Sequence, residues 1–99
     1  RHPNRGRARV MNAEWTQISP QEAAALHAAI LAAHAHHDLE QLVELYAIAA
    51  DSKEREGDVD AACFFLTQAF VFALETGISR AHELNRRLVA YGRAWPLEP

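Results

Sequence analysis

The sequence is poor in the residues that interrupt or cross-link a fold. Its 99 residues include four glycines, four prolines and a single cysteine, Cys63. One cysteine excludes an internal disulfide, and no glycine-rich loop of the kind that cradles phosphate groups is present. No basic start is followed by an apolar run long enough to mark a secretory signal or a membrane span. We therefore expect a soluble, reduced, cytoplasmic protein with no membrane partner.

Catalytic chemistry is equally scarce. No pair of acid and base side chains is evident, and no nucleophile lies near a base. Cys63 lies within the most apolar part of the chain, CFFLTQAFVFAL, where a cysteine serves as a small hydrophobic residue. The sequence therefore predicts a protein that is not an enzyme and needs no cofactor.

Charge is distributed unevenly along the chain. The first ten residues, RHPNRGRARV, hold four of the ten basic residues and no acid, so the net charge of −3 becomes −7 for the remainder. We interpret residues 1–18 as a flexible basic leader and residues 19–97 as one helical domain. The acidic domain, and the lack of aromatic residues among the arginines, argue against a nucleic-acid partner.

Abundant alanine and the absence of strand-like alternation predict an all-α fold. The stretch Ser19-Pro20-Gln21-Glu22 is a helix start, with a serine cap, proline in the first turn and a glutamate that closes a capping box. Aspartates and Ser79 supply further caps, and glycines supply stops. The sequence predicts four antiparallel helices joined by tight turns, over residues 20–36, 38–56, 58–76 and 79–92. The apolar stripe of the last helix continues through Ala81, Leu84, Leu88, Tyr91 and Trp95.

One segment is similar to a known repeat. In GDVDAACFFLTQA (residues 57–69) a Gly-Asp turn is followed by a small, a bulky and a small residue at Ala62, Leu66 and Ala69, as in the second helix of a tetratricopeptide repeat. In the preceding helix, Tyr46 and Ala50 match that repeat's large and small positions. The resemblance covers about residues 39–74.

This resemblance implies a fold and a class of function. Lys53 and Leu74 depart from the pattern, and the helix pair is longer than the usual repeat. We expect a tetratricopeptide-like right-handed array, or alternatively a compact four-helix bundle. The family resemblance implies protein or peptide binding, through the fold alone.

Aromatic residues exceed what four short helices can hide, so part of one helix flank is expected to remain open as an apolar patch. Such a patch favours docking of a protein or peptide partner, or self-association into a homo-oligomer. The expected surface is a groove framed by the helices at 38–56 and 79–92, with Tyr46, Phe64, Phe65, Phe72, Arg80 and Arg87 as binding residues.

The stretch AHAHHD (residues 33–38) raises an alternative function. His34 and His37 are three residues apart and would share a metal ion if one helix continued through both. The competing interpretation buries the rings of His27 and His34 against the next helix and places His37 at a helix end. A metal- or cofactor-binding bundle therefore stands as the alternative to an interaction module.

Overall fold

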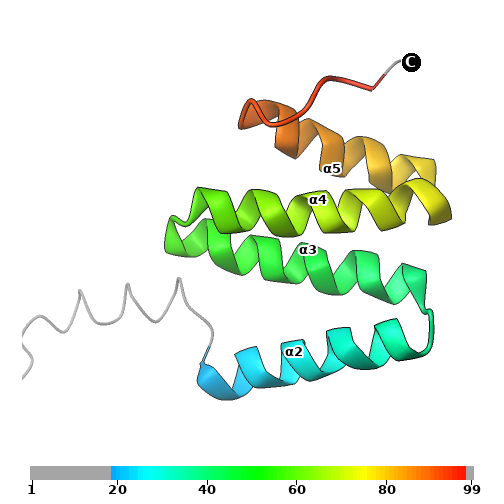
Figure 1. Cartoon of the computed structure of the whole chain (residues 1–99). Helices are drawn as coiled ribbons and strands as arrows, with labels where there is room; N and C mark the ends of the chain where they lie inside the picture. The colour runs from blue at the N-terminus through cyan, green and yellow to red at the C-terminus, as the bar shows by residue number, and fades with distance from the viewer. Residues whose placement is uncertain (1–18, 98–99) are drawn as a thin grey trace, which may run out of the picture.

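The computed structural model describes residues 19–97. Within this range the chain forms only helices: α2 (Pro20–Ala35), α3 (Leu39–Glu56), α4 (Val59–Thr76) and α5 (Ile78–Ala90) (Figure 1). The all-α prediction is confirmed, and the helix ends lie within two residues of those predicted. The expected basic leader at residues 1–18 falls outside the described residues.

The predicted helix starts are present at three of the four positions. Ser19 and Glu22 form the expected capping box, each side chain accepting a hydrogen bond from the backbone N–H of the other residue, at 3.1 and 2.8 Å. Asp38 and Asp58 cap α3 and α4 by accepting from the backbone N–H three residues later, at 3.2 and 3.1 Å. These local signals fix where the chain turns.

The turns after α2 and after α3 share one geometry. Each contains a residue in the left-handed region, His37 at φ 54° and Gly57 at φ 81°. The aspartate that follows donates its backbone N–H to a carbonyl five residues earlier, at 2.9 Å in both turns. The same aspartate then caps the next helix. These two turns therefore repeat one geometry at an interval of 20 residues.

The last helix differs from its prediction at both ends. Ser79 is not its cap, because the helix already begins at Ile78 after the extended residue Gly77 and has no side-chain cap. It ends at Ala90, since Gly92 adopts φ 73° and the chain turns away. Trp95 therefore lies outside the helix, and its side chain is 89% exposed. The predicted apolar stripe ends before this residue.

Successive helices lie side by side (Figure 1). Among the described helices, close approach of the backbones is confined to α2 with α3, α3 with α4, and α4 with α5. Helices two apart in the chain meet only through long side chains, as described below. The result is an open layer, in which α3 and α4 are each covered by two neighbours.

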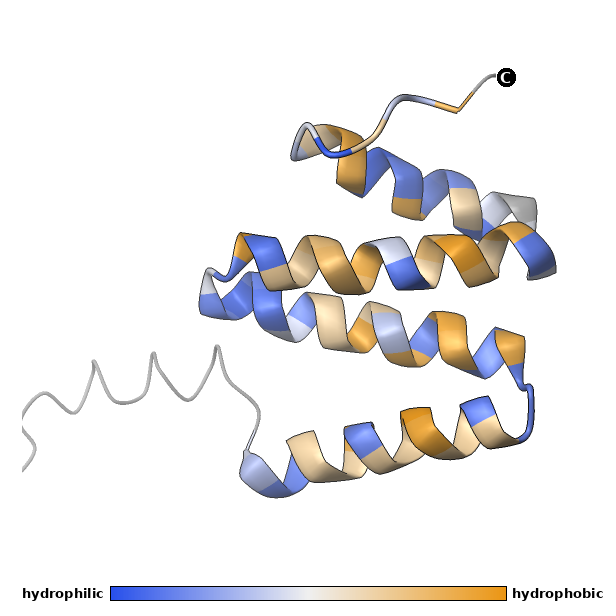
Figure 2. Ribbon diagram, in the orientation of Figure 1, coloured by the Kyte–Doolittle hydropathy of each residue, from blue (hydrophilic) through white to orange (hydrophobic). Residues whose placement is uncertain are grey.

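The main core lies between α3, α4 and α5, and Figure 2 shows the middle helix of the three, α4, as mostly apolar. Many of its buried residues are alanines, which let the helices approach closely. Leucines fill the remaining space, and each contributes about 1.5–3 kcal/mol by its burial. The main core contains Val43, Ala47, Ala50, Cys63, Leu66, Ala69, Ala73, Ala81, Leu84 and Leu88.

The contact between α2 and α3 is much smaller. Ala33 is the one residue of α2 that is fully buried, and it packs with Leu42 and Leu45 of α3. Figure 1 shows α2 lying near α3 at its C-terminal end and farther from it at its N-terminal end. The helix α2 is therefore attached at one end and diverges at the other.

The segment after α5 is held by one buried side chain. The Asn85 amide donates to the carbonyl of Trp95 at 3.0 Å and accepts from the backbone N–H of Leu97 at 3.2 Å. Asn85 is only 4% exposed, so these two hydrogen bonds satisfy an otherwise costly buried amide. They fix the course of residues 91–97 beside α5.

Among the described helices, α4 alone is long and apolar enough to cross a membrane by length and composition, a test that core helices of soluble proteins also pass. Its inner face forms the centre of the main core, with Ala62, Leu66 and Ala69 fully buried. Its opposite face is also apolar. That second face is considered below.

Candidate functional site: a groove between α2 and α4

Five rings from three helices form one continuous aromatic row. Tyr46 of α3 stacks on Phe65 and Phe72 of α4, with ring centroids 6.1 Å apart in both pairs. His34 of α2 meets Tyr46 and Phe72 edge-on, at 6.0 and 5.8 Å. Phe64 extends the row by an edge-on contact with Phe65 at 5.3 Å. Because Phe65 and Phe72 are two helical turns apart, both flank Tyr46 on one side of α4.

A hydrogen bond fixes this row across helices. Nε2 of His34 and the hydroxyl of Tyr46 are 3.0 Å apart. His34 brings α2 into contact with Phe72 of α4, although the backbones of these two helices do not approach each other. The rings of Tyr46, Phe65 and Phe72 are half-buried, while Phe64 is 57% exposed. The row is thus anchored in the core and open on its outer side.

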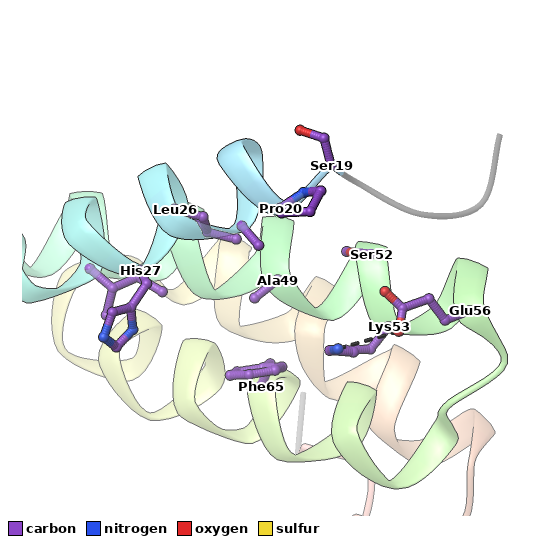
Figure 3. A pocket seen from close by; sticks show the side chains of 11 residues that line it. Ser19, Pro20, Leu26, His27, Ala49, Ser52, Lys53, Glu56 and Phe65 are labelled. Carbon is purple, nitrogen blue, oxygen red and sulfur yellow. Dashed lines mark hydrogen bonds and ion pairs between the residues drawn. The ribbon is translucent and has the colours of Figure 1, made fainter. Parts of the chain in front are cut away.

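Beside the row lies a hollow of about 400 Å³ (Figure 3). It occupies the space left where α2 diverges from α3, and Phe65 of α4 forms one wall. Phe65 also belongs to the aromatic row, so the two features are continuous. The hollow is lined by Ser19, Pro20, Ala23, Leu26, His27, Ile30, Ala49, Ser52, Lys53, Glu56 and Phe65. We call the hollow together with the aromatic row the α2–α4 groove.

The lining of the hollow is apolar on the α2 side and polar toward the end of α3. Leu26 and Ile30 are half-buried and supply apolar surface. Lys53 and Glu56 form an ion pair, with Nζ and Oε1 3.3 Å apart, which Figure 3 marks with a dashed line. A few polar groups on an apolar concave surface are typical of sites that bind a ligand or a partner side chain.

The predicted arginines lie on the other side of α3. Arg80 of α5 binds Glu44 through two nitrogens, each 3.1 Å from a carboxylate oxygen, and also pairs with Glu83. Glu44 and Tyr46 are two positions apart, which separates their side chains by about 200° around the helix. The predicted binding residues therefore form two groups, aromatic rings in the α2–α4 groove and arginines between α3 and α5.

The second arginine joins α5 to α3 in the same way. One terminal nitrogen of Arg87 lies 2.7 Å from Asp51 and 2.6 Å from Glu54, and the Tyr91 hydroxyl donates to Glu54 at 2.6 Å. Burial raises the pKa of Glu54, but the hydrogen bonds from Tyr91 and Arg87 and the positive charge of Arg87 together lower it below its ordinary value. Burial lowers the pKa of Arg87, and its two carboxylate partners more than reverse this effect. Arg87 thus stabilises the fold by linking α5 to α3.

His34 and His37, the metal ligands of the alternative interpretation, do not lie on one helix. The helix α2 ends at Ala35, so His37 lies in the turn, at φ 54°, and the shared helical face on which a common metal ion depended is absent. His34 is engaged with Tyr46 instead. Within residues 19–97 no group of three or more His, Cys, Asp or Glu side chains is placed to hold a metal ion. The expectation that His27 and His34 are buried is wrong, because both are exposed.

Sequence reasoning missed the hollow itself. The hollow forms because α2 diverges from α3, and no local sequence pattern encodes that divergence. One signal was present in PQEAAALHAAILAAHA, the sequence of α2, which is apolar on all sides. A helix of this kind has more apolar surface than a single neighbouring helix can cover. Comparison with protein-family models, with curated proteins and with solved structures finds no match for this chain. The assignment of a function therefore depends on the groove and on the residues that form it.

Proposed function

We propose that this chain is a non-catalytic protein-interaction module that binds an extended or helical segment of another protein in the α2–α4 groove. The observation that carries the proposal is the continuity of the aromatic row with the apolar hollow through Phe65. Interfaces draw most of their binding energy from a few aromatic residues near well-packed pockets. The α2–α4 groove places aromatic residues beside such a pocket.

The form of the groove specifies how such a segment would bind. A volume of about 400 Å³ lies within the range of about 300–1,000 Å³ that ligand pockets occupy. One large apolar side chain of the partner would enter the hollow, between Leu26 and Phe65. The neighbouring part of the segment would then cover Tyr46 and Phe72. Lys53, at the rim, would meet a carboxylate or a backbone carbonyl of the partner.

The proposed fold is an antiparallel, tetratricopeptide-like array in which α3 and α4 form the complete hairpin. Side chains support this arrangement, because alternate helices are linked on opposite faces of the layer. Arg80 and Arg87 link α5 to α3, while His34 links α2 to α4. A layer with two such faces is the arrangement that helical-repeat proteins use to present binding surfaces.

The test fills the hollow without disturbing the core. Ala23 is exposed on α2 and lines the hollow, whereas the adjacent and equally exposed Ala24 does not. Peptides would be selected from a displayed random library on the wild-type chain and their affinities measured by calorimetry. We expect Ala23→Trp to weaken binding at least about tenfold, a cost of about 1.4 kcal/mol, and Ala24→Trp to leave it unchanged.

The outcome separates a groove-binding module from other uses of the chain. Both variants should retain the wild-type helical circular dichroism spectrum, since neither position is buried. Peptides that bind wild type and Ala23→Trp equally well would show that the hollow is not the binding site. Failure to select any peptide that binds the wild-type chain would contradict the proposal as a whole.

A further inference from the structure

The outer face of α4 carries a second apolar surface, separate from the hollow. Phe64, Val71 and Leu74 are 57%, 46% and 48% exposed, and Thr67 is also exposed. Their spacings of three, four and three residues place them along one line of the helix. Figure 2 shows α4 as apolar along most of its length. We call Phe64, Thr67, Val71 and Leu74 the outer stripe.

The spacing of the outer stripe is that of the contact positions of a two-helix coiled coil, over nearly two heptads. The two large residues, Phe64 and Leu74, lie at the ends of the stripe, and the smaller Thr67 and Val71 lie between them. In antiparallel pairing with an identical stripe, Phe64 would therefore face Leu74, and Thr67 would face Val71. Burial of Thr67 leaves no unpaired hydroxyl, since its Oγ1 already donates to the carbonyl of Cys63 at 2.8 Å. We infer that the outer stripe pairs antiparallel with the outer stripe of a second copy of this chain, forming a two-fold symmetric dimer.

Charge selects the antiparallel orientation. The helix α4 contains two acidic residues, Asp60 and Glu75, one near each end, and no lysine or arginine. Arg93 lies at the Asp60 end, with its guanidinium 2.7 Å from the Asp60 carboxylate and its side chain 44% exposed. Antiparallel pairing brings Glu75 of the second copy within about one helical turn of the Asp60–Arg93 ion pair, in which the charge of Arg93 offsets that of Asp60. Parallel pairing would place like acids side by side.

The size of the stripe sets the expected strength of the dimer. Three large exposed side chains on each copy bury less surface than the roughly 800 Å² per partner of a standard interface. A weak, concentration-dependent dimer follows, with a dissociation constant on the order of 10–500 μM. A membrane surface fits the stripe less well, because helices that lie on membranes usually have a basic polar face.

The experiment is sedimentation velocity of the full chain from about 10 μM to about 1 mM, the range in which such a dimer dissociates. We expect the average mass to rise toward twice that of the monomer. Val71→Glu should weaken association at least about tenfold, because it buries an unpaired charge. The matched control is Leu31→Glu on α2, a residue that is 56% exposed and outside the stripe, and it should associate as wild type does.

A charge exchange tests the orientation. Glu75→Arg and Arg93→Glu should each weaken the dimer, and the two together should restore it to within about threefold of wild type. All variants lie at exposed positions, and Leu74→Gln replaces Val71→Glu if circular dichroism shows that the latter loses helix.

Four results would overturn the inference. A wild-type chain that stays monomeric at about 1 mM excludes the dimer. Equal weakening by Leu31→Glu and Val71→Glu places the interface elsewhere, and a double charge exchange that fails to restore association excludes the antiparallel pairing. Binding to phosphatidylcholine vesicles that Val71→Glu abolishes would assign the stripe to a membrane instead. Phe64 belongs to both the aromatic row and the outer stripe. The readouts above are nevertheless the mass and the vesicle binding of the chain without any peptide, so this proposal and that of peptide binding in the α2–α4 groove can fail separately.

Discussion

Replacing Arg87 by methionine should detach α5 partly from α3 while keeping the aliphatic volume of the side chain. Arg87 donates to Asp51 at 2.7 Å and to Glu54 at 2.6 Å, and these bonds join two helices whose backbones do not approach each other. Exposed ion pairs contribute about 0.2–1 kcal/mol, and hydrogen bonds to charged groups contribute about 1.5–3 kcal/mol.

Partial burial places this network between those limits. The side chains of Arg87 and Glu54 are 27% and 28% exposed, and that of Asp51 is 46% exposed. We therefore expect Arg87→Met to lower the free energy of unfolding by about 1–2 kcal/mol at pH 7. For a domain of this size each kcal/mol lowers the melting temperature by about 4–8 °C. Urea denaturation followed by circular dichroism would measure the change.

The pH dependence gives the sharper test. Because the folded-state pKa of Glu54 is lowered, its stabilisation is complete above the unfolded pKa of about 4.3 and is lost as the pH falls through the folded pKa. The stabilities of wild type and Arg87→Met should therefore converge as the pH is lowered from about 5 through the lowered folded-state pKa of Glu54. A cycle that combines Arg87→Met with Glu54→Gln should show a coupling free energy of about 1 kcal/mol.

A matched control is available one residue earlier. Arg86 is exposed, so Arg86→Met changes the same charge without removing a link to α3. Its effect on the free energy of unfolding should stay within about 0.5 kcal/mol. Two results would refute this account of Arg87. One is that Arg86→Met lowers the free energy of unfolding as much as Arg87→Met does. The other is that the difference in the free energy of unfolding between wild type and Arg87→Met stays the same as the pH is lowered.

Two further predictions concern the core and the turns. Leu66 is fully buried at the centre of the main core, so Leu66→Ala should cost about 2–5 kcal/mol in urea denaturation, and a loss below about 1 kcal/mol would contradict the packing of α4. His37 and Gly57 both have positive φ, so His37→Gly should stabilise by about 0.5–1 kcal/mol and Gly57→Ala should destabilise by about 1 kcal/mol. The melting temperature should therefore rise for His37→Gly and fall for Gly57→Ala. A shift in the same direction for both variants would show that the two turns are not equivalent.

Local signals predicted where the chain turns because their chemistry is local. Ser19, Asp38 and Asp58 act on backbone groups two or three residues away, and the structure shows all three bonds. The same reasoning failed at Ser79, where the helix starts earlier without a side-chain cap, and at Trp95. The three-and-four spacing of apolar residues continued past Gly92, but a left-handed glycine ends the helix whatever residues follow it.

Sequence patterns did not predict the contacts between helices. Periodicity predicts which residues share a face, yet it does not set how one helix is rotated or tilted against the next. Tyr46, Phe65 and Arg80 were assigned to a single surface, whereas the structure separates the rings from the arginine by nearly half a turn of α3. The partners Arg80 and Glu44 are 36 residues apart, a separation at which no local rule applies.

The attachment of α2 has a dynamic consequence. With Ala33 as its one fully buried residue, α2 can open at a free energy well below that needed to unfold the α3–α4–α5 core. Since α2 forms one wall of the groove, local opening of α2 would remove the groove while the α3–α4–α5 core stays folded. The affinity for a bound segment would be reduced by the free energy needed to keep α2 in place. Substitutions that strengthen the packing of α2 on α3 beside Ala33 would therefore raise the affinity for the bound segment without adding any contact to it.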